Sequence, residues 1–165
     1  MKISARRWPY IIQPCLVVFY AAFVLVLLHF DEHSAVFDAV ALCSLLATAF
    51  AFFIMPRAPL TKLKNVLGGY AISLLSGVSF SLLAQKVLAY FPASADIVLM
   101  VFGLFSLFFV MVLMIALDYR HPPAMGLALA LLILPWTSIG LLMIALAIFV
   151  MAGVYKIFYP YLQAL

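Results

Sequence analysis

Charged residues are scarce in this sequence: only 8% of its 165 residues are Asp, Glu, Lys or Arg, whereas 70% are hydrophobic. A soluble globular domain is about one quarter charged and about half apolar. This deficit excludes an ordinary water-soluble protein and indicates a polytopic membrane protein. No polar stretch is long enough for a second domain, so we expect a single transmembrane domain over residues 1–165.

Cysteine is also rare, and cationic runs are lacking. Cys15 and Cys43 are too few and too isolated for a zinc or redox motif, and each lies in an apolar run, so we expect buried apolar thiols. The nine Lys and Arg residues form no run that could follow a nucleic-acid backbone, which argues against a nucleic-acid partner. We expect no metal and no cofactor.

Long apolar runs make up most of the chain. Four are long enough to cross a bilayer: residues 9–30, 34–55, 66–91 and 95–117. The last apolar stretch, 124–158, is too long for one span and short for two, and Pro135-Trp136-Thr137-Ser138 interrupts it. We expect a half-length helix over 124–134 and a full span over 139–158. The predicted fold is therefore an all-α transmembrane bundle of five full spans plus a proline-started half helix.

The distribution of cations predicts the topology. Seven of the nine Lys and Arg residues fall before the first run, between the second and third runs, or after the fourth. Because cytoplasmic loops are enriched in Lys and Arg, we expect a multi-pass protein of the cell (inner) membrane with a cytoplasmic N-terminus. The side of the C-terminus depends on whether the half helix crosses or re-enters, which the sequence leaves open.

The half helix starts at His121-Pro122-Pro123-Ala124. Proline is tolerated in the first turn of a helix, where its missing N–H has no partner to lose. The unpaired N–H groups and partial positive charge of a helix N-terminus can hold an anion. We expect N–H donors from Met125 onward, and Gly126 would let a ligand approach the backbone.

These considerations select three groups of residues. The candidate anion site comprises His121, Pro122, Pro123, Met125, Gly126, Asn65, Gly68 and Gly69. Four cations, Arg57, Lys62, Lys64 and Arg120, would raise the anion concentration at its mouth. The candidate gating residues are His121, Asp118 and Lys86. In each case a plainer alternative stays open: the prolines only start a helix, the cations only set the topology, His121 only fixes the turn, and Lys86 only reaches the interface.

Two further features have mainly structural interpretations. The 66–91 run is rich in Gly and Ser, which favours close helix packing or a cavity wall. His29 and His33 are spaced like metal ligands on one helical face, although an ordinary external loop is the preferred interpretation.

Two proline motifs carry a family resemblance. They are His121-Pro122-Pro123-Ala124 with Gly126 and Ala128-Leu129, and Pro56-Arg57-Ala58-Pro59-Leu60 followed by Asn65-Val66-Leu67-Gly68-Gly69. Together they resemble the HPP family of integral membrane proteins over about residues 45–158. The resemblance implies a module with a four-span core and, for plastid and cyanobacterial members, nitrite transport. The chain departs from the family pattern at Leu127, where threonine is frequent.

We therefore expect a transporter or channel-like protein for a small inorganic anion such as nitrite, and not an enzyme. Its expected partners are that anion and the lipid bilayer. The alternative is a non-transporting membrane scaffold that forms homo-oligomers or other assemblies. A donor-lined cavity between the half helix and the 66–91 span would favour transport, whereas a packed centre would favour a scaffold.

Overall fold

The computed structural model describes residues 9–28 and 35–163, and within them it forms an all-α bundle. Its helices are α1 (Pro9–Leu28), α2 (Ala35–Ile54), α3 (Leu63–Tyr90), α4 (Ala95–Ala116), α5 (Pro123–Ile133) and α6 (Ser138–Phe158), with short 3₁₀ turns at Pro59–Thr61, Pro92–Ser94 and Tyr159–Tyr161. Five of these helices are long and apolar enough to cross a membrane, and α5 is not. The predicted bundle of five spans plus a half helix is confirmed.

The ends of α5 and α6 follow from their sequences. Pro123 is the first residue of α5, where a missing N–H costs nothing. Leu134, the residue before Pro135, is extended (φ −116°, ψ 148°), because a following proline disfavours helical backbone. The Thr137 side chain then accepts a hydrogen bond from the Gly140 N–H (2.9 Å) and caps the start of α6.

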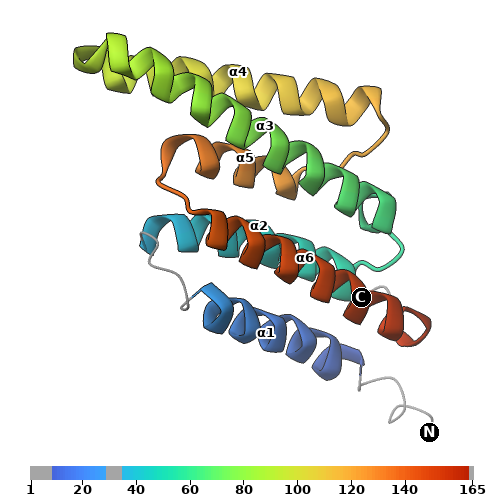
Figure 1. Ribbon diagram of the computed structural model, residues 1–165. Coiled ribbons are helices and arrows are strands. Elements are labelled where there is room, and N and C mark those ends of the chain that lie inside the picture. Colours follow the sequence, from blue (N-terminus) through green and yellow to red (C-terminus); the bar gives the residue numbers. More distant parts are fainter. Residues whose placement is uncertain (1–8, 29–34, 164–165) are drawn as a thin grey trace, which may run out of the picture.

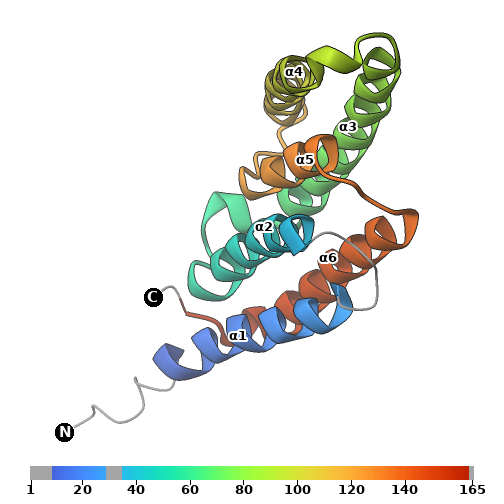
Figure 2. The ribbon, with the colours of Figure 1, turned by 90° about the vertical axis from the view of Figure 1, so that its left-hand side faces the viewer.

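The half helix lies in the middle of the bundle. Figures 1 and 2 show α5 between α2 on one side and α3 and α4 on the other, and α5 contacts all three. In the same views α6 lies beside α1 and α2, against which it packs, and it meets α3 only slightly. The bundle therefore has an α1–α2–α6 part and an α3–α4–α5 part, joined mainly where α2 contacts α5.

The contact between α3 and α5 is tight. A Cβ atom added to Gly77 would lie 2.9 Å from the Ala128 carbonyl oxygen, so the two backbones leave no room for a methyl group. Ser73, Leu127 and Leu131 are fully buried around this crossing. The small residues of α3 thus serve helix packing here, and the donor-lined cavity that would have favoured transport is not found at this crossing.

Both termini of the described chain lie at one end of the bundle. Tyr155 near the end of α6 donates a hydrogen bond to the Pro56 carbonyl (2.8 Å), and Gln13 near the start of α1 donates one to the Gln163 carbonyl (2.8 Å). The half helix and the linker after it therefore carry the chain away from this end, and α6 returns it (Figure 1). The end of α6 thus lies at the same end of the bundle as the start of α1, the arrangement expected if the half helix and its linker carry the chain across.

This end, called here the basic end, holds five of the six Lys and Arg residues within the described ranges: Arg57, Lys62, Lys64, Arg120 and Lys156. The sixth, Lys86, is exposed near the far end of α3. It lies about 25 Å along the helix axis from Gly69.

The expected burial of both thiols is wrong. Cys15 and Cys43 are exposed on the outer faces of α1 and α2. An apolar neighbourhood does not imply burial in a membrane protein, because the lipid around the bundle is as apolar as its core.

Candidate functional site

The turn before α5 is built by a helix-ending motif. The Tyr119 N–H bonds to the Met114 carbonyl (2.9 Å) and the Asp118 N–H bonds to the Ile115 carbonyl (3.3 Å), the pattern of a Schellman motif at the end of α4. Asp118 takes the left-handed conformation of this motif (φ 55°), which Asp tolerates better than most residues. The chain thereby reverses, and His121 enters the bundle.

His121 is fully buried and uses both ring nitrogens. Nδ1 lies 3.2 Å from the Leu60 carbonyl oxygen and Nε2 lies 2.8 Å from Thr48 Oγ1. Because a carbonyl can only accept, we assign the proton to Nδ1, and Nε2 then accepts from the threonine hydroxyl. Burial lowers the pKa of His121 to about 4, with the bond to Leu60 opposing the shift, so the ring is neutral at neutral pH.

Further hydrogen bonds tie the turn to α2 and α3. The Tyr70 hydroxyl donates to the Ser44 carbonyl (3.0 Å) and lies 2.8 Å from Thr48 Oγ1. Ser44 Oγ donates to the Pro123 carbonyl (2.7 Å). These residues, His121, Thr48, Tyr70 and Ser44, form what we call the His121 network. It favours the alternative in which His121 fixes the turn.

The two motif glycines permit the close approach of the turn to α3. A Cβ atom on Gly68 would lie 2.4 Å from the Tyr119 ring, and one on Gly69 would lie 2.7 Å from His121 Cβ. Any larger residue at either position would push the turn away from the helix. The Gly68-Gly69 and His-Pro-Pro motifs are therefore two sides of one contact.

The N-terminus of α5 does not offer the free donors that the sequence suggested. Pro122 and Pro123 have no N–H, the Ala124 N–H bonds to the His121 carbonyl (3.1 Å) and the Met125 N–H bonds to the Pro122 carbonyl (3.0 Å). The expected anion site at Met125 is corrected accordingly, because the tight turn uses the first two N–H groups itself. Gly126 has open space around its α-carbon, with no atom within 4 Å of an added Cβ.

Cationic side chains do gather beside this turn. They line a cavity of about 370 Å³, which we call the turn cavity. Its lining residues are Pro59, Leu60, Lys62, Lys64, Asn65, Asp118, Arg120 and Pro122. The structure thus brings together three of the four predicted mouth cations with Asn65 and Pro122. The Asn65 Nδ2 donates to the Pro59 carbonyl (2.9 Å), whereas its buried Oδ1 has no partner among the described residues.

Asp118 is the acid of the turn cavity. Its carboxylate accepts from Lys64 Nζ (3.0 Å) and lies 3.7 Å from Arg120 Nε. The hydrogen bond and charge of Lys64 lower the pKa of Asp118, and Arg120 and Lys62 add to the effect. All of these groups are exposed to solvent, so the pairs are weak and exchangeable.

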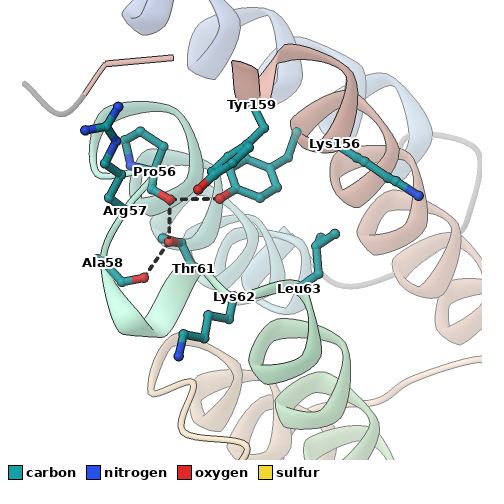
Figure 3. A pocket seen from close by; sticks show the side chains of 9 residues that line it. Pro56, Arg57, Ala58, Thr61, Lys62, Leu63, Lys156 and Tyr159 are labelled. Atoms are coloured by element: carbon teal, nitrogen blue, oxygen red, sulfur yellow. Dashed lines mark hydrogen bonds between the residues drawn. The ribbon is translucent and has the colours of Figure 1, made fainter. Parts of the chain in front are cut away.

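A larger cavity of about 590 Å³ lies beside the turn cavity and is called here the Arg57 cavity (Figure 3). It is lined by Pro56, Arg57, Ala58, Thr61, Lys62, Leu63, Tyr155, Lys156 and Tyr159. Sequence reasoning missed the contribution of α6. The signal was present in Tyr155-Lys156 and Tyr159 at the end of the last apolar run, since Tyr and Lys together mark a membrane interface.

The structure does not bring two of the predicted groups to this site. Lys86 is remote from the His-Pro-Pro turn and does not join the other proposed gating residues. His29 and His33 lie outside the described residues. Within 9–28 and 35–163, no group of three His, Cys, Asp or Glu side chains could hold a metal ion.

The apolar helices and the cationic end define a polytopic helical membrane protein. The family model described as HPP, transmembrane region, matches residues 4–160, so the chain belongs to the HPP transmembrane family. This match confirms the resemblance carried by the two proline motifs and extends it toward the N-terminus. No curated protein and no solved structure matches the chain.

Proposed function

We propose that this HPP-family protein transports a small inorganic anion, which it collects at the turn cavity. One observation carries the proposal: Lys62, Lys64 and Arg120 line the same cavity, beside the His-Pro-Pro turn. Three cations face a single carboxylate there, so the local potential stays positive. The positive-inside rule supports a cytoplasmic location for this face, and hence a cytoplasmic N-terminus in the inner membrane.

In this proposal the anion is held by side chains and not by the N-terminus of α5. An entering anion would compete with Asp118 for Lys64 and Arg120, whose exposed ion pairs are easily exchanged. The neutral, buried His121 serves as an anchor that fixes the cations relative to the bundle. Nitrite is the anion that the family resemblance implies, and its single negative charge suits a cavity lined by cations.

Passage beyond the turn cavity requires movement of α5, because α3 and α5 are in backbone contact at Gly77 and Ala128. Two features of the half helix suit it to such movement. It is short, and extended backbone at Leu134 and Thr137 flanks its C-terminal side. We propose that it shifts relative to α3 during transport.

The experiment is nitrite flux into proteoliposomes that contain the purified full-length protein. Arg120→Gln should weaken the apparent nitrite affinity about fivefold, the equivalent of about 1 kcal/mol of Coulomb attraction. Lys86→Gln removes the same charge at the far end of α3 and should leave flux unchanged. Asp118→Asn should strengthen affinity, since it removes the competing carboxylate. Equal effects of Arg120→Gln and Lys86→Gln would refute the turn cavity as the collecting site.

A second function, a membrane scaffold without transport, is favoured by the closed α3–α5 contact. An apolar groove of about 230 Å³ between α4 and α5 gives a scaffold a surface for another helix. The groove is lined by Leu99, Met100, Gly103, Leu104, Leu107, Leu129 and Ile133. Folded protein that gives no flux, and whose mass in detergent falls from oligomer to monomer in Gly103→Phe, would select this alternative.

A further inference from the structure

The Arg57 cavity has features that a small inorganic anion does not need. Its walls come from three segments: the loop after α2, the start of α3 and the last turns of α6. The volume of about 590 Å³ falls in the range of pockets that enclose drug-sized ligands. Such a volume is several times that of a triatomic anion, so it fits a larger molecule.

Its rim is positively charged without compensation. Figure 3 shows the charged ends of Arg57, Lys62 and Lys156 pointing outward from the cavity in three different directions. None of the lining residues is acidic, and these three cations form no ion pair with the described part of the chain. Asp118 pairs instead with Lys64 and Arg120 in the neighbouring turn cavity. The rim is therefore available to an external anion.

The floor is apolar and fixed. The Tyr155 ring stacks on Phe52 (centroids 4.0 Å apart) and meets the Tyr159 ring edge-on (5.4 Å). Two hydroxyl groups of the floor are already used: Tyr155 donates to the Pro56 carbonyl (2.8 Å), and the Thr61 hydroxyl donates to the Ala58 carbonyl (2.7 Å). A ligand would thus meet aromatic surface, and the flexible side chains of Arg57, Lys62 and Lys156 would have to turn inward to reach it.

The position of the cavity suits a ligand with one polar and one apolar end. Leu63 is the first residue of α3, and Tyr155, Lys156 and Tyr159 end α6, so the cavity lies at the helix ends, at the level of a bilayer interface. It lies between the start of α3 and the end of α6, two helices that meet only slightly. Basic pockets between helices on the positively charged side of membrane proteins suit phosphate head groups of anionic lipids.

We propose that the Arg57 cavity binds the phosphate head group of an anionic phospholipid, with Arg57, Lys62 and Lys156 around the phosphate and Tyr155 and Tyr159 beneath the glycerol and upper acyl chains. This binding does not depend on the proposed transport. It would attach the end of α6 to the loop after α2 through a lipid, beside their direct hydrogen bond.

The test is a thermal-shift titration of the purified full-length protein in neutral detergent with phosphatidylglycerol, phosphatidylcholine or glycerol 3-phosphate. We expect phosphatidylglycerol to raise the unfolding temperature saturably and the other two to do so far less. In the double variant Arg57→Gln/Lys156→Gln, the apparent affinity should fall roughly 30-fold, since each cation near an anionic lipid contributes about a factor of five.

The matched control is Lys64→Gln/Arg120→Gln, which removes the same charge from residues that line only the turn cavity. It should keep the response to phosphatidylglycerol, and Arg57→Lys/Lys156→Arg should keep it also. Equal loss in both Gln pairs would show a general surface potential and overturn the proposal. An equal response to phosphatidylcholine would overturn the charge argument, and an equal response to glycerol 3-phosphate would replace the lipid with a soluble phosphate.

Discussion

A neutral imidazole that donates to a backbone carbonyl and accepts from a hydroxyl is a rigid bridge between chain segments. His121 bridges the loop after α2, through Leu60, to α2 itself, through Thr48. Its burial keeps water away from both bonds, which makes each stronger and makes an unpaired ring costly. The histidine of the His-Pro-Pro motif therefore holds the turn in place. The cations around the turn face the solvent.

This environment predicts a pH dependence of stability. The pKa of His121 is about 4 in the folded protein and about 6.5 in the unfolded chain. Between these values the unfolded state binds a proton that the folded state does not, so the free energy of unfolding should fall as the pH is lowered from about 6.5 to about 4. Thermal unfolding in detergent, followed by circular dichroism, measures the effect.

The control for this prediction is His121→Gln, which keeps an amide donor and acceptor but cannot titrate in this range. Its stability at pH 7.5 should be lower by about 1–3 kcal/mol, the cost of imperfect buried hydrogen bonds. Its loss of stability toward pH 4 should be smaller than that of the wild type. His29 and His33 are present in both proteins and cancel in the comparison. Parallel pH profiles would contradict the assignment.

At the scale of helices, α5 is held by close backbone contact more than by specific side-chain bonds. It packs most extensively against α3, and the close approach of these two helices depends on the lack of a side chain at Gly77. In lipid, where apolar burial gives little drive for association, such close packing supplies much of the attraction between helices. A residue at this crossing should therefore affect stability more than its small size suggests.

Gly77→Ala is expected to destabilise the bundle by about 1–3 kcal/mol, since the new methyl group would lie 2.9 Å from a backbone oxygen that cannot move aside alone. The matched control is Gly153→Ala on α6, where an added Cβ meets nothing within 4 Å. That change should be neutral or stabilising by up to about 1 kcal/mol, because alanine is the better helix former. Unfolding temperatures in the same detergent compare the two, and a tolerated Gly77→Ala would refute the tight crossing.

The helices were largely predictable because apolar runs and prolines act on the backbone near them in the sequence. The half helix at Pro123 and the break at Pro135 follow from missing N–H groups and restricted backbone. The start of α3 at Leu63 was placed three residues late, since the charges of Lys62 and Lys64 look like a loop although their stems reach water from a helix end.

The candidate sites were less predictable because they depend on contacts between distant segments. No local pattern shows that Thr48 and Leu60 would occupy the nitrogens of His121, or that Tyr155 and Lys156 would face Arg57. The free N–H groups expected at Met125 were lost to a tight turn whose hydrogen bonds depend on local backbone geometry. Burial of the cysteines failed for a different reason: in lipid, hydropathy does not separate the inside of a bundle from its outside.

At the scale of the whole molecule, the path of α6 predicts the topology. Epitope tags added at residue 1 and after residue 165 should show the same protease accessibility in sealed membrane vesicles, because α6 ends beside the start of α1. A tag inserted at Pro92–Ser94, between α3 and α4, should show the opposite accessibility. Opposite results for the two terminal tags would mean that the half helix re-enters and that α6 runs the other way.

The pairing of Gln13 with Gln163 has a consequence for biosynthesis. The Gln13 amide donates to the carbonyls of Phe53 and Gln163 and accepts from the Gln163 N–H, all at a buried position on the first helix. A ribosome delivers residue 163 long after residue 13, since 150 positions separate them, so this amide waits for two of its three bonds until α6 has been synthesised. These bonds to α1 therefore form only after α6 has been made, and a protein that lacks residue 163 would leave part of the Gln13 amide without partners in apolar surroundings.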